Sequence, residues 1–152
     1  RCPEHFSVEG KEIEQAYLGS GFFTIRARTY GDQGYLTIKT PKESDDGAAQ
    51  RLEFEYEIPL REAKDLIRLA DNKIEKIRYL YPNGLEIDVF SGELEGLILA
   101  EWELDEGKEP EPPEGIDWIN ISLNMNYTNR AMSVMGLPQD AVFANRTKKA
   151  KI

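Results

Sequence analysis

Charged residues alternate with apolar residues along six segments of this chain, and the charged set combines phosphate-binding and metal-binding types. Its basic members are Arg26, Arg28, Lys39, Arg51, Lys76 and Arg78. Its acidic members are Glu53, Glu55, Glu86, Asp88, Glu101 and Glu103. Arginine matches phosphate oxygens bidentately and lysine adds a point charge, whereas carboxylates suit Mg²⁺ or Mn²⁺. The combination points to phosphoryl-transfer chemistry on a polyanion with a divalent metal.

The spacing of these charges predicts that they share one face of a β-sheet. Alternate strand residues face the same way, so Arg26 pairs in phase with Arg28, and Glu101 with Glu103. The two glutamates would lie about 7 Å apart along a strand, which suits a shared metal. The alternative is an ordinary antiparallel sheet with a solvated charged face. Two features disfavour this alternative: uncharged polar residues are few at these positions, and basic and acidic residues are mostly grouped on different strands. If the sheet closed into a barrel, the basic and the acidic groups would surround one polar lumen.

The charged residues lie in segments that are typical of β-strands. Each is rich in β-branched and aromatic residues with approximate period-2 alternation, and turn residues separate most of them. The expected strands are 22–30, 35–40, 50–58, 73–81, 84–91 and 97–105, with a weaker one at 11–18.

Two helices are expected beside the strands. The first spans about 60–71, and its apolar face consists of Leu60, Ala63, Leu66, Ile67 and Ala70. The second spans about 126–135, with an apolar stripe of Ala131, Val134 and Met135. Residues 106–117 are acidic and proline-rich, which predicts a loop.

Composition limits the class of protein. With 152 residues, one domain is expected over 1–136, followed by a basic C-terminal tail or linker over 137–152. The formal net charge of −9 argues against a nucleic-acid partner. No apolar run is long enough to cross a membrane, so no membrane partner is expected. Cys2 is the only cysteine, which excludes an internal disulfide and favours a cytoplasmic location.

Six motifs, in order, resemble those of the CYTH domain of the triphosphate tunnel metalloenzymes. They are Arg26-x-Arg28, Leu36-Thr37-Ile38-Lys39, Arg51-x-Glu53-x-Glu55, Glu75-Lys76-x-Arg78-Tyr79, Glu86-x-Asp88-Val89-Phe90-x-Gly92 and Ala100-Glu101-x-Glu103. In front of them, Gln15-Ala16-Tyr17-Leu18 is similar to the Gln-Gly-Tyr-Leu segment of bacterial members. The resemblance runs from about Glu12 to Asn129.

The resemblance implies an α+β, mainly β fold: an antiparallel eight-stranded β-barrel tunnel with helices packed outside. It implies that phosphate is bound by Arg26, Arg28, Lys39, Arg51, Lys76 and Arg78. It also implies that Mg²⁺ or Mn²⁺ is bound by Glu53, Glu55, Asp88, Glu101 and Glu103, with Glu53 and Glu101 as catalytic residues. Family members hydrolyse inorganic or thiamine triphosphate, and some cyclise ATP. A metal-dependent triphosphatase is therefore expected, with a small-molecule triphosphate, above all inorganic triphosphate, as its substrate; a homodimer stays open.

The chain departs from the family pattern in two places. The family's first strand carries Glu-x-Glu-x-Lys, whereas Glu12 to Leu18 corresponds to the second strand, so the first is expected to precede Arg1. In the run after Trp118, Asn124 and Asn126 stand where the family has Asp and Arg. Both departures favour an alternative function, a non-catalytic module that binds polyphosphate or a nucleoside triphosphate. A thiamine triphosphatase or an adenylate cyclase also stays open, whereas the charged phase disfavours a carrier of apolar ligands.

Overall fold

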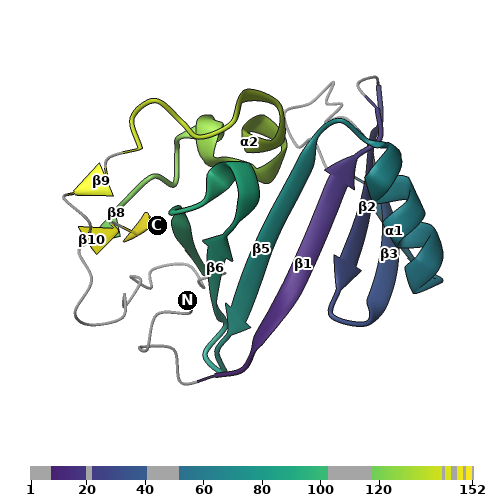
Figure 1. Cartoon of the computed structure of the whole chain (residues 1–152), viewed down its shortest axis with the longest axis horizontal. Coiled ribbons are helices and arrows are strands. Elements are labelled where there is room, and N and C mark those ends of the chain that lie inside the picture. Colours follow the sequence, from purple (N-terminus) through teal and green to yellow (C-terminus); the bar gives the residue numbers. More distant parts are fainter. Residues whose placement is uncertain are drawn as a thin grey trace, which may run out of the picture. The chain divides into compact units, whose positions relative to one another are not determined.

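The computed structural model describes residues 8–19, 22–40, 52–102 and 118–141, together with the backbone of three short strands between 143 and 151. The chain forms two compact units, one made of residues 13–74 and the other of the residues on either side. Both are built mainly from antiparallel strands, and each contains a short α-helix (Figure 1). The expected fold class, mainly β and antiparallel with helices beside the strands, is confirmed.

The unit of residues 13–74 contains four adjacent antiparallel strands in the order β4-β3-β2-β1. They are β1 (Gly10–Tyr17), which enters this unit at Ile13, β2 (Thr24–Tyr30), β3 (Gln33–Lys39) and β4 (Glu53–Ile58). Helix α1 (Leu60–Leu69) lies against β2 and β3 (Figure 1), and Ile67 packs against Ala16 and Ala27. These small alanines let the helix approach the sheet closely, so α1 covers the apolar face and leaves the charged face on the opposite side.

Gly34 permits the same close approach on β3. A Cβ atom at this position would lie 2.8 Å from the carbonyl oxygen of Ile58 and 2.9 Å from the Cβ of Ala63. Neither the backbone at the end of β4 nor the first turn of α1 can move away without losing its own contacts. Any larger residue would therefore push the helix off the sheet.

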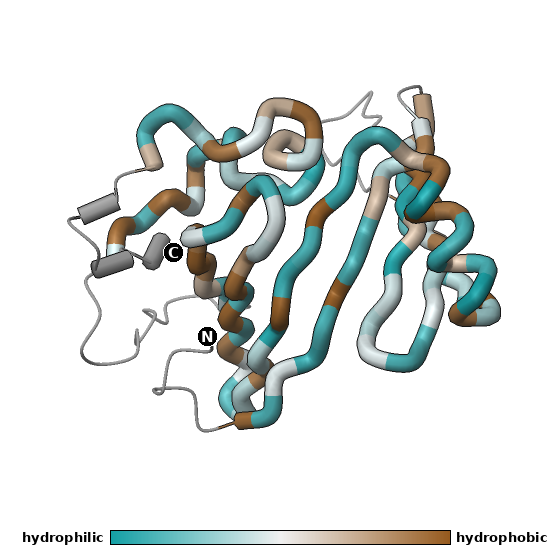
Figure 2. The backbone as a smooth tube through the Cα atoms, in the orientation of Figure 1, coloured by the Kyte–Doolittle hydropathy of each residue, from teal (hydrophilic) through white to brown (hydrophobic). Residues whose placement is uncertain are grey.

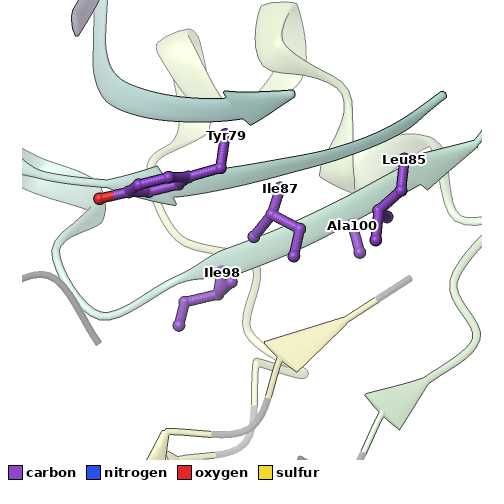
Figure 3. Close-up of a cluster of buried hydrophobic side chains, with 5 residues drawn as sticks. All are labelled: Tyr79, Leu85, Ile87, Ile98 and Ala100. Atoms are coloured by element: carbon purple, nitrogen blue, oxygen red, sulfur yellow. The ribbon is translucent and has the colours of Figure 1, made fainter. Parts of the chain in front are cut away.

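The second unit is centred on β5 (Lys73–Leu80), β6 (Leu85–Phe90) and β7 (Ile98–Trp102), which pair antiparallel in that order. Their apolar side chains form one cluster, Tyr79, Leu85, Ile87, Ile98 and Ala100 (Figure 3). Gly84, with φ of 83°, lies in the turn between β5 and β6, where an L side chain would be strained. The 3-10 helix η1 (Gly92–Leu94) joins β6 to β7.

The C-terminal elements of this unit are short. They are β8 (Trp118–Ile119), the 3-10 helix η2 (Met125–Tyr127), α2 (Asn129–Met135), β9 (Phe143–Ala144), β10 (Thr147–Lys148) and β11 (Ala150–Lys151). β9 pairs with β10, whereas β11 pairs in parallel with both β7 and β8. The domain boundary expected at residue 136 stays a prediction.

The predicted second helix, 126–135, is two helices. Thr128 is extended, with φ of −70° and ψ of 144°, and its side chain accepts a hydrogen bond from the Ala131 N–H, so it caps α2. The predicted apolar stripe is wrong: Met132 is buried, whereas Val134 and Met135 are 64% and 65% exposed. Because the helix begins at Asn129, its face toward the protein is set by the Thr128 cap and by Met132 rather than by the most apolar side chains.

Strands β1–β7 agree with the predicted segments except at their ends, whereas β8–β11 were not predicted. Phe22 and Phe23 precede β2 and are exposed, and β7 is described only as far as Trp102. Teal and brown stretches both occur along β1 and β5 (Figure 2), but Ile74 and Ile77 of β5 lie three residues apart, so the period-2 pattern holds only approximately there. Residues 103–117, which include the predicted acidic loop, lie outside the described residues. Neither described α-helix is long and apolar enough to cross a membrane.

Candidate active site

The charged face of β1–β4 carries a row of residues that lie opposite one another across three strands. Arg26 on β2 is in register with Thr37 on β3, which is in register with Glu55 on β4. The Arg26 guanidinium donates to Thr37 Oγ1 at 3.2 Å, and the Thr37 hydroxyl donates to Glu55 Oε2 at 2.9 Å. Arg26 Nη2 is also 3.5 Å from Glu55 Oε2. Beside this row, Lys39 forms an ion pair with Glu53 at 3.2 Å.

A second arginine contact, which is partly buried, involves β1. Gln15 is fully buried, and its Oε1 accepts a hydrogen bond from Arg28 Nε at 3.1 Å. Gln15 Nε2 in turn donates to the Tyr17 hydroxyl at 3.2 Å. A neutral amide thus orients the Arg28 guanidinium without neutralising its charge.

The Nε of Arg26 is buried and has no hydrogen-bond partner among the described residues. Leaving a charged donor unsatisfied in this way is costly. A phosphate oxygen is the kind of acceptor that a guanidinium binds best. This orphaned donor therefore fits a site that binds an oxyanion.

Thr37 is expected to hold the Arg26–Glu55 contact together. Thr37→Val keeps the shape but removes the hydroxyl, so we expect a loss of about 1–3 kcal/mol in the free energy of unfolding. Urea denaturation measures this loss, and Thr37→Ser, which retains the hydroxyl, should lose less. Equal stability of Thr37→Val and the parent chain would show that the hydroxyl contributes nothing.

The charged face of β5–β7 contains a buried ion network centred on Asp88. Arg78 lies directly opposite Asp88 and donates to both carboxylate oxygens, from Nε at 2.7 Å and from Nη2 at 2.8 Å. Lys76 Nζ donates to Asp88 Oδ2 at 2.5 Å. The side chains of Lys76 and Asp88 are 0% and 2% exposed. One carboxylate therefore serves two cations in a site from which solvent is largely excluded.

Burial and charge shift the pKa values of this network. Burial lowers the pKa of Lys76 below its ordinary value, and the charge of Asp88 offsets only part of that effect. Burial alone would raise the pKa of Asp88, but the hydrogen bonds from Arg78 and the charge of Lys76 outweigh it and lower the pKa. Asp88 is thus held ionised between two cations. Such coupled, perturbed groups gather at functional sites more often than on ordinary sheet faces.

Two further carboxylates lie beside the network. Glu86 on β6 and Glu101 on β7 are in register, and Glu86 forms an ion pair with Arg78 Nη1 at 2.5 Å. Glu101 Oε2 is 3.9 Å from Arg78 Nη2, and its side chain is 54% exposed. Desolvation and the charge of Asp88 raise the pKa of Glu101. Glu101 therefore interacts with Arg78 more weakly than Glu86 or Asp88 does.

Carboxylate oxygens are the kind of ligand that a hard divalent cation prefers. Both oxygens of Asp88, however, already accept hydrogen bonds from Lys76 or Arg78. Within the described part of the chain, no three acidic, histidine or cysteine side chains are grouped closely enough to hold a metal. Burial and, after it, the charge of Asp88 raise the pKa of Glu101, and a bound cation would counter both effects by favouring the ionised carboxylate. Glu101 therefore fits the role of a ligand better than Asp88 does.

Asn129, the first residue of α2, joins this network from a different element. Its Oδ1 accepts a hydrogen bond from Lys76 Nζ at 3.2 Å, across 53 residues of sequence. Asn124, in contrast, supports the local fold: its Oδ1 accepts from the Asn126 N–H, and its Nδ2 donates to Asp140 Oδ2 at 3.0 Å. Asn126 is exposed, and among the described residues its side chain makes no hydrogen bond or ion pair with the ion network.

The structure places most of the predicted site residues on two strand faces. Arg26, Arg28, Lys39, Glu53 and Glu55 share the face of β1–β4. Lys76, Arg78, Asp88 and Glu101 share the face of β5–β7. Arg51 and Glu103 lie outside the described residues.

Sequence reasoning did not assign Gln15, Thr37 or Asn129 to the site. Gln15 and Thr37 are in phase with the charged residues of their strands, so the alternation that located the arginines could have located them too. Asn129 gave no such signal, because its contact with Lys76 arises only from the way α2 meets β5.

The interpretation as an ordinary solvated face does not fit the β5–β7 network. Exposed ion pairs keep both partners in water, whereas Lys76 and Asp88 are almost completely removed from it. Burying such a pair is expensive and adds little net stability. The burial therefore favours a site at which these charges are used.

Known proteins match this arrangement in sequence and in structure. An inorganic triphosphatase of Acetivibrio thermocellus is 38% identical over 137 residues, which cover 72% of this chain and 83% of the relative. One of Nitrosomonas europaea is 27% identical over 140 residues, 81% of this chain and 87% of the relative. The crystal structure of an inorganic triphosphatase aligns with a TM-score of 0.60 at 25% identity and covers 83% of each chain. It supports the tunnel fold expected from the motifs. The model of the CYTH domain matches residues 8–122, most of the chain, so this protein belongs to the CYTH domain family.

Proposed function

We propose that this protein is a triphosphatase that hydrolyses inorganic triphosphate with Mg²⁺ or Mn²⁺. The observation that carries the proposal is the buried network of Lys76, Arg78 and Asp88 in a chain that is 38% identical to an inorganic triphosphatase. Cations held in a site of low solvent content bind a polyphosphate more strongly than exposed ones do.

The basic and the acidic residues of the site would have different roles in the reaction. Arg26, Arg28, Lys39, Lys76 and Arg78, with Arg51 from outside the described residues, would bind phosphate oxygens. Lys76 and Arg78 would keep the phosphate chain in one position, because their own geometry is fixed by Asp88. Water attacks the terminal phosphorus, the bridging P–O bond breaks, and diphosphate leaves with that electron pair. Positive charge around the phosphates stabilises the negative charge of the transition state.

The carboxylates would supply metal binding and proton chemistry. We propose that Glu53, Glu55, Glu101 and Glu103 serve as ligands of the divalent cation, whereas Asp88 orients Lys76 and Arg78 through its ion pairs. The cation would neutralise phosphate charge and orient water. Glu101 and Glu53 would accept hydrogen bonds from the attacking water. One of these two carboxylates would take up the proton that this water loses.

Phosphate release tests the proposal. Inorganic triphosphate, ATP and thiamine triphosphate are each incubated with the protein in Mg²⁺, in Mn²⁺ and in EDTA. We expect the highest kcat/KM for inorganic triphosphate and no release in EDTA. A chain extended upstream of Arg1 serves as a comparison, because the first strand of the family pattern is not found in these residues. Preference for ATP or thiamine triphosphate would change the substrate, and no release from any of them by either chain would overturn the proposal.

Glu101→Gln is expected to reduce metal-dependent turnover by about 100-fold or more, because a ligand and proton acceptor is replaced by a neutral amide. Its metal requirement should also shift to a higher Mn²⁺ concentration. The matched control is Glu95→Gln, an exposed glutamate outside both charged faces. Unchanged activity and metal requirement in Glu101→Gln would exclude Glu101 from the site.

A second candidate function is binding without turnover. It is favoured by Asn124, whose side chain is occupied by the Asn126 N–H and by Asp140 where the family pattern has an acid. A chain of this kind would be stabilised by triphosphate without releasing phosphate. The two functions are separated when melting temperature and phosphate release are measured on the same sample.

A further inference from the structure

The ammonium group of Lys76 makes a contact that no sequence motif indicates, the one with Asn129. An ammonium group has three N–H donors. One reaches Asp88 Oδ2 at 2.5 Å and one reaches Asn129 Oδ1 at 3.2 Å. No third oxygen acceptor is found among the described residues, and Nζ lies 5.3 Å from the centre of the Phe90 ring.

The two oxygen partners of Lys76 differ in charge, and this difference affects how strongly the ammonium group can attract a bound anion. Asp88 is shared with Arg78, so its single negative charge is divided between two cations. Asn129 accepts a hydrogen bond from Lys76 but adds no negative charge. An aspartate at this position would bring a further negative charge to a network that already contains Asp88, Glu86 and Glu101. A neutral acceptor therefore fixes the ammonium while its charge remains available.

The position of Asn129 is fixed by the start of α2. Thr128 Oγ1 donates to the carbonyl of Met125 at 2.9 Å and accepts from the Ala131 N–H at 3.2 Å. Met132, one turn further, is buried. These contacts anchor the start of α2, whose first side chain, Asn129, reaches Lys76.

We propose that Asn129 is a positioning residue for triphosphate binding: it holds the Lys76 ammonium in place, and a phosphate oxygen takes the third N–H in exchange for the contact with the Phe90 ring. The inference rests on the proposed function, because it takes a triphosphate as the anion. Cation–π contacts of this kind are weaker than a charge-assisted hydrogen bond, so the exchange favours the phosphate.

Two variants separate the position of the ammonium from its charge. Asn129→Leu is similar in size but cannot accept a hydrogen bond. We expect about tenfold weaker binding of triphosphate, the equivalent of about 1.4 kcal/mol. Asn129→Asp keeps the acceptor and the shape but adds a negative charge. We expect Lys76 to stay in place in this variant while triphosphate binding weakens through repulsion.

Binding is measured by isothermal titration of triphosphate in EDTA, so that turnover does not contribute. The position of Lys76 is measured by NMR, from the Nζ–H signal that disappears in Lys76→Met. This signal should persist in Asn129→Asp and be lost to solvent exchange in Asn129→Leu. The matched control is Ser133→Ala, a buried position on the same helix whose hydroxyl donates a hydrogen bond to the Arg130 carbonyl. The Ser133→Ala variant should show any loss of stability that comes from perturbing α2, and it should bind triphosphate as tightly as the parent chain.

Asn129→Leu that binds triphosphate as tightly as Ser133→Ala would overturn the inference, as would a Lys76 signal that is unchanged in Asn129→Leu. If the parent chain hydrolyses triphosphate and Asn129→Leu is indistinguishable from it, the inference fails alone. If the parent chain neither binds nor hydrolyses triphosphate, the proposed function fails with it.

Discussion

Asp88→Asn is expected to be the most destabilising single substitution on the charged faces. Asp88 is 2% exposed and is the shared partner of Lys76 and Arg78. Asparagine has nearly the same shape, but it leaves the buried Lys76 without its countercharge and removes the bidentate partner of Arg78, which keeps its ion pair with Glu86. Breaking a buried pair in this way costs about 3–5 kcal/mol. For a chain of this size, that corresponds to a decrease of roughly 10 °C or more in the melting temperature.

The control for this prediction is Asp65→Asn. Asp65 forms an ion pair with Arg68 on α1, and the Arg68 side chain is 75% exposed. Exposed pairs of this kind contribute less than about 1 kcal/mol, so the melting temperature should barely change. Equal melting temperatures for the two variants would show that the Asp88 network is not stabilised by its charge.

The same network predicts how stability depends on pH. The pKa of Asp88 is lower in the folded than in the unfolded chain. Its ion pairs therefore stabilise the fold fully above about pH 4, the ordinary pKa of aspartate, and the contribution is lost as the pH falls through the lower folded-state value. The difference in melting temperature between the parent chain and Asp88→Asn should be constant from pH 5 to 7 and should narrow below about pH 4.

Among substitutions on the charged faces, Lys76→Met is expected to weaken triphosphate binding most while it costs the least free energy of unfolding. Methionine fills a similar volume, and Asp88 retains both hydrogen bonds from Arg78. Removing one partner of a buried ion pair is costly mainly because it leaves the other charge uncompensated, and here Asp88 stays paired with Arg78, so the cost should be small. The phosphate, in contrast, loses a fixed cation in a poorly solvated site. We expect kcat/KM for triphosphate to fall by about 100-fold or more, or about 2.7 kcal/mol.

The matched control is Lys73→Met at the exposed start of β5. It removes one positive charge from the same strand without touching the ion network, so kcat/KM should change by less than about twofold. Steady-state kinetics and thermal unfolding on the two variants give the answer together. A large loss of stability in Lys76→Met, or equal kinetics in both variants, would contradict the assignment of Lys76 to the site.

The sequence determined the faces of the strands. Because side chains alternate with a period of two, the phase of Arg26, Lys76 and Asp88 in the sequence already placed them opposite the apolar residues. The structure confirms this: Ile87 lies in the core cluster, whereas Asp88 beside it lies in the ion network. The helix of residues 60–69 followed from its 3.6-residue apolar period in the same way.

Only the tertiary structure decided which charges meet, and at what depth. Register brings Arg78 opposite Asp88 and Arg26 opposite Thr37, and no local pattern specifies register between strands. The mistaken stripe of Val134 and Met135 has the same origin, since the Thr128 cap and the contact of Asn129 with Lys76 set the face of α2. Alternation is a property of neighbouring residues, whereas burial and pairing depend on groups far apart in the chain. The chemistry of the site could therefore be predicted from residue types, and its ion network could not.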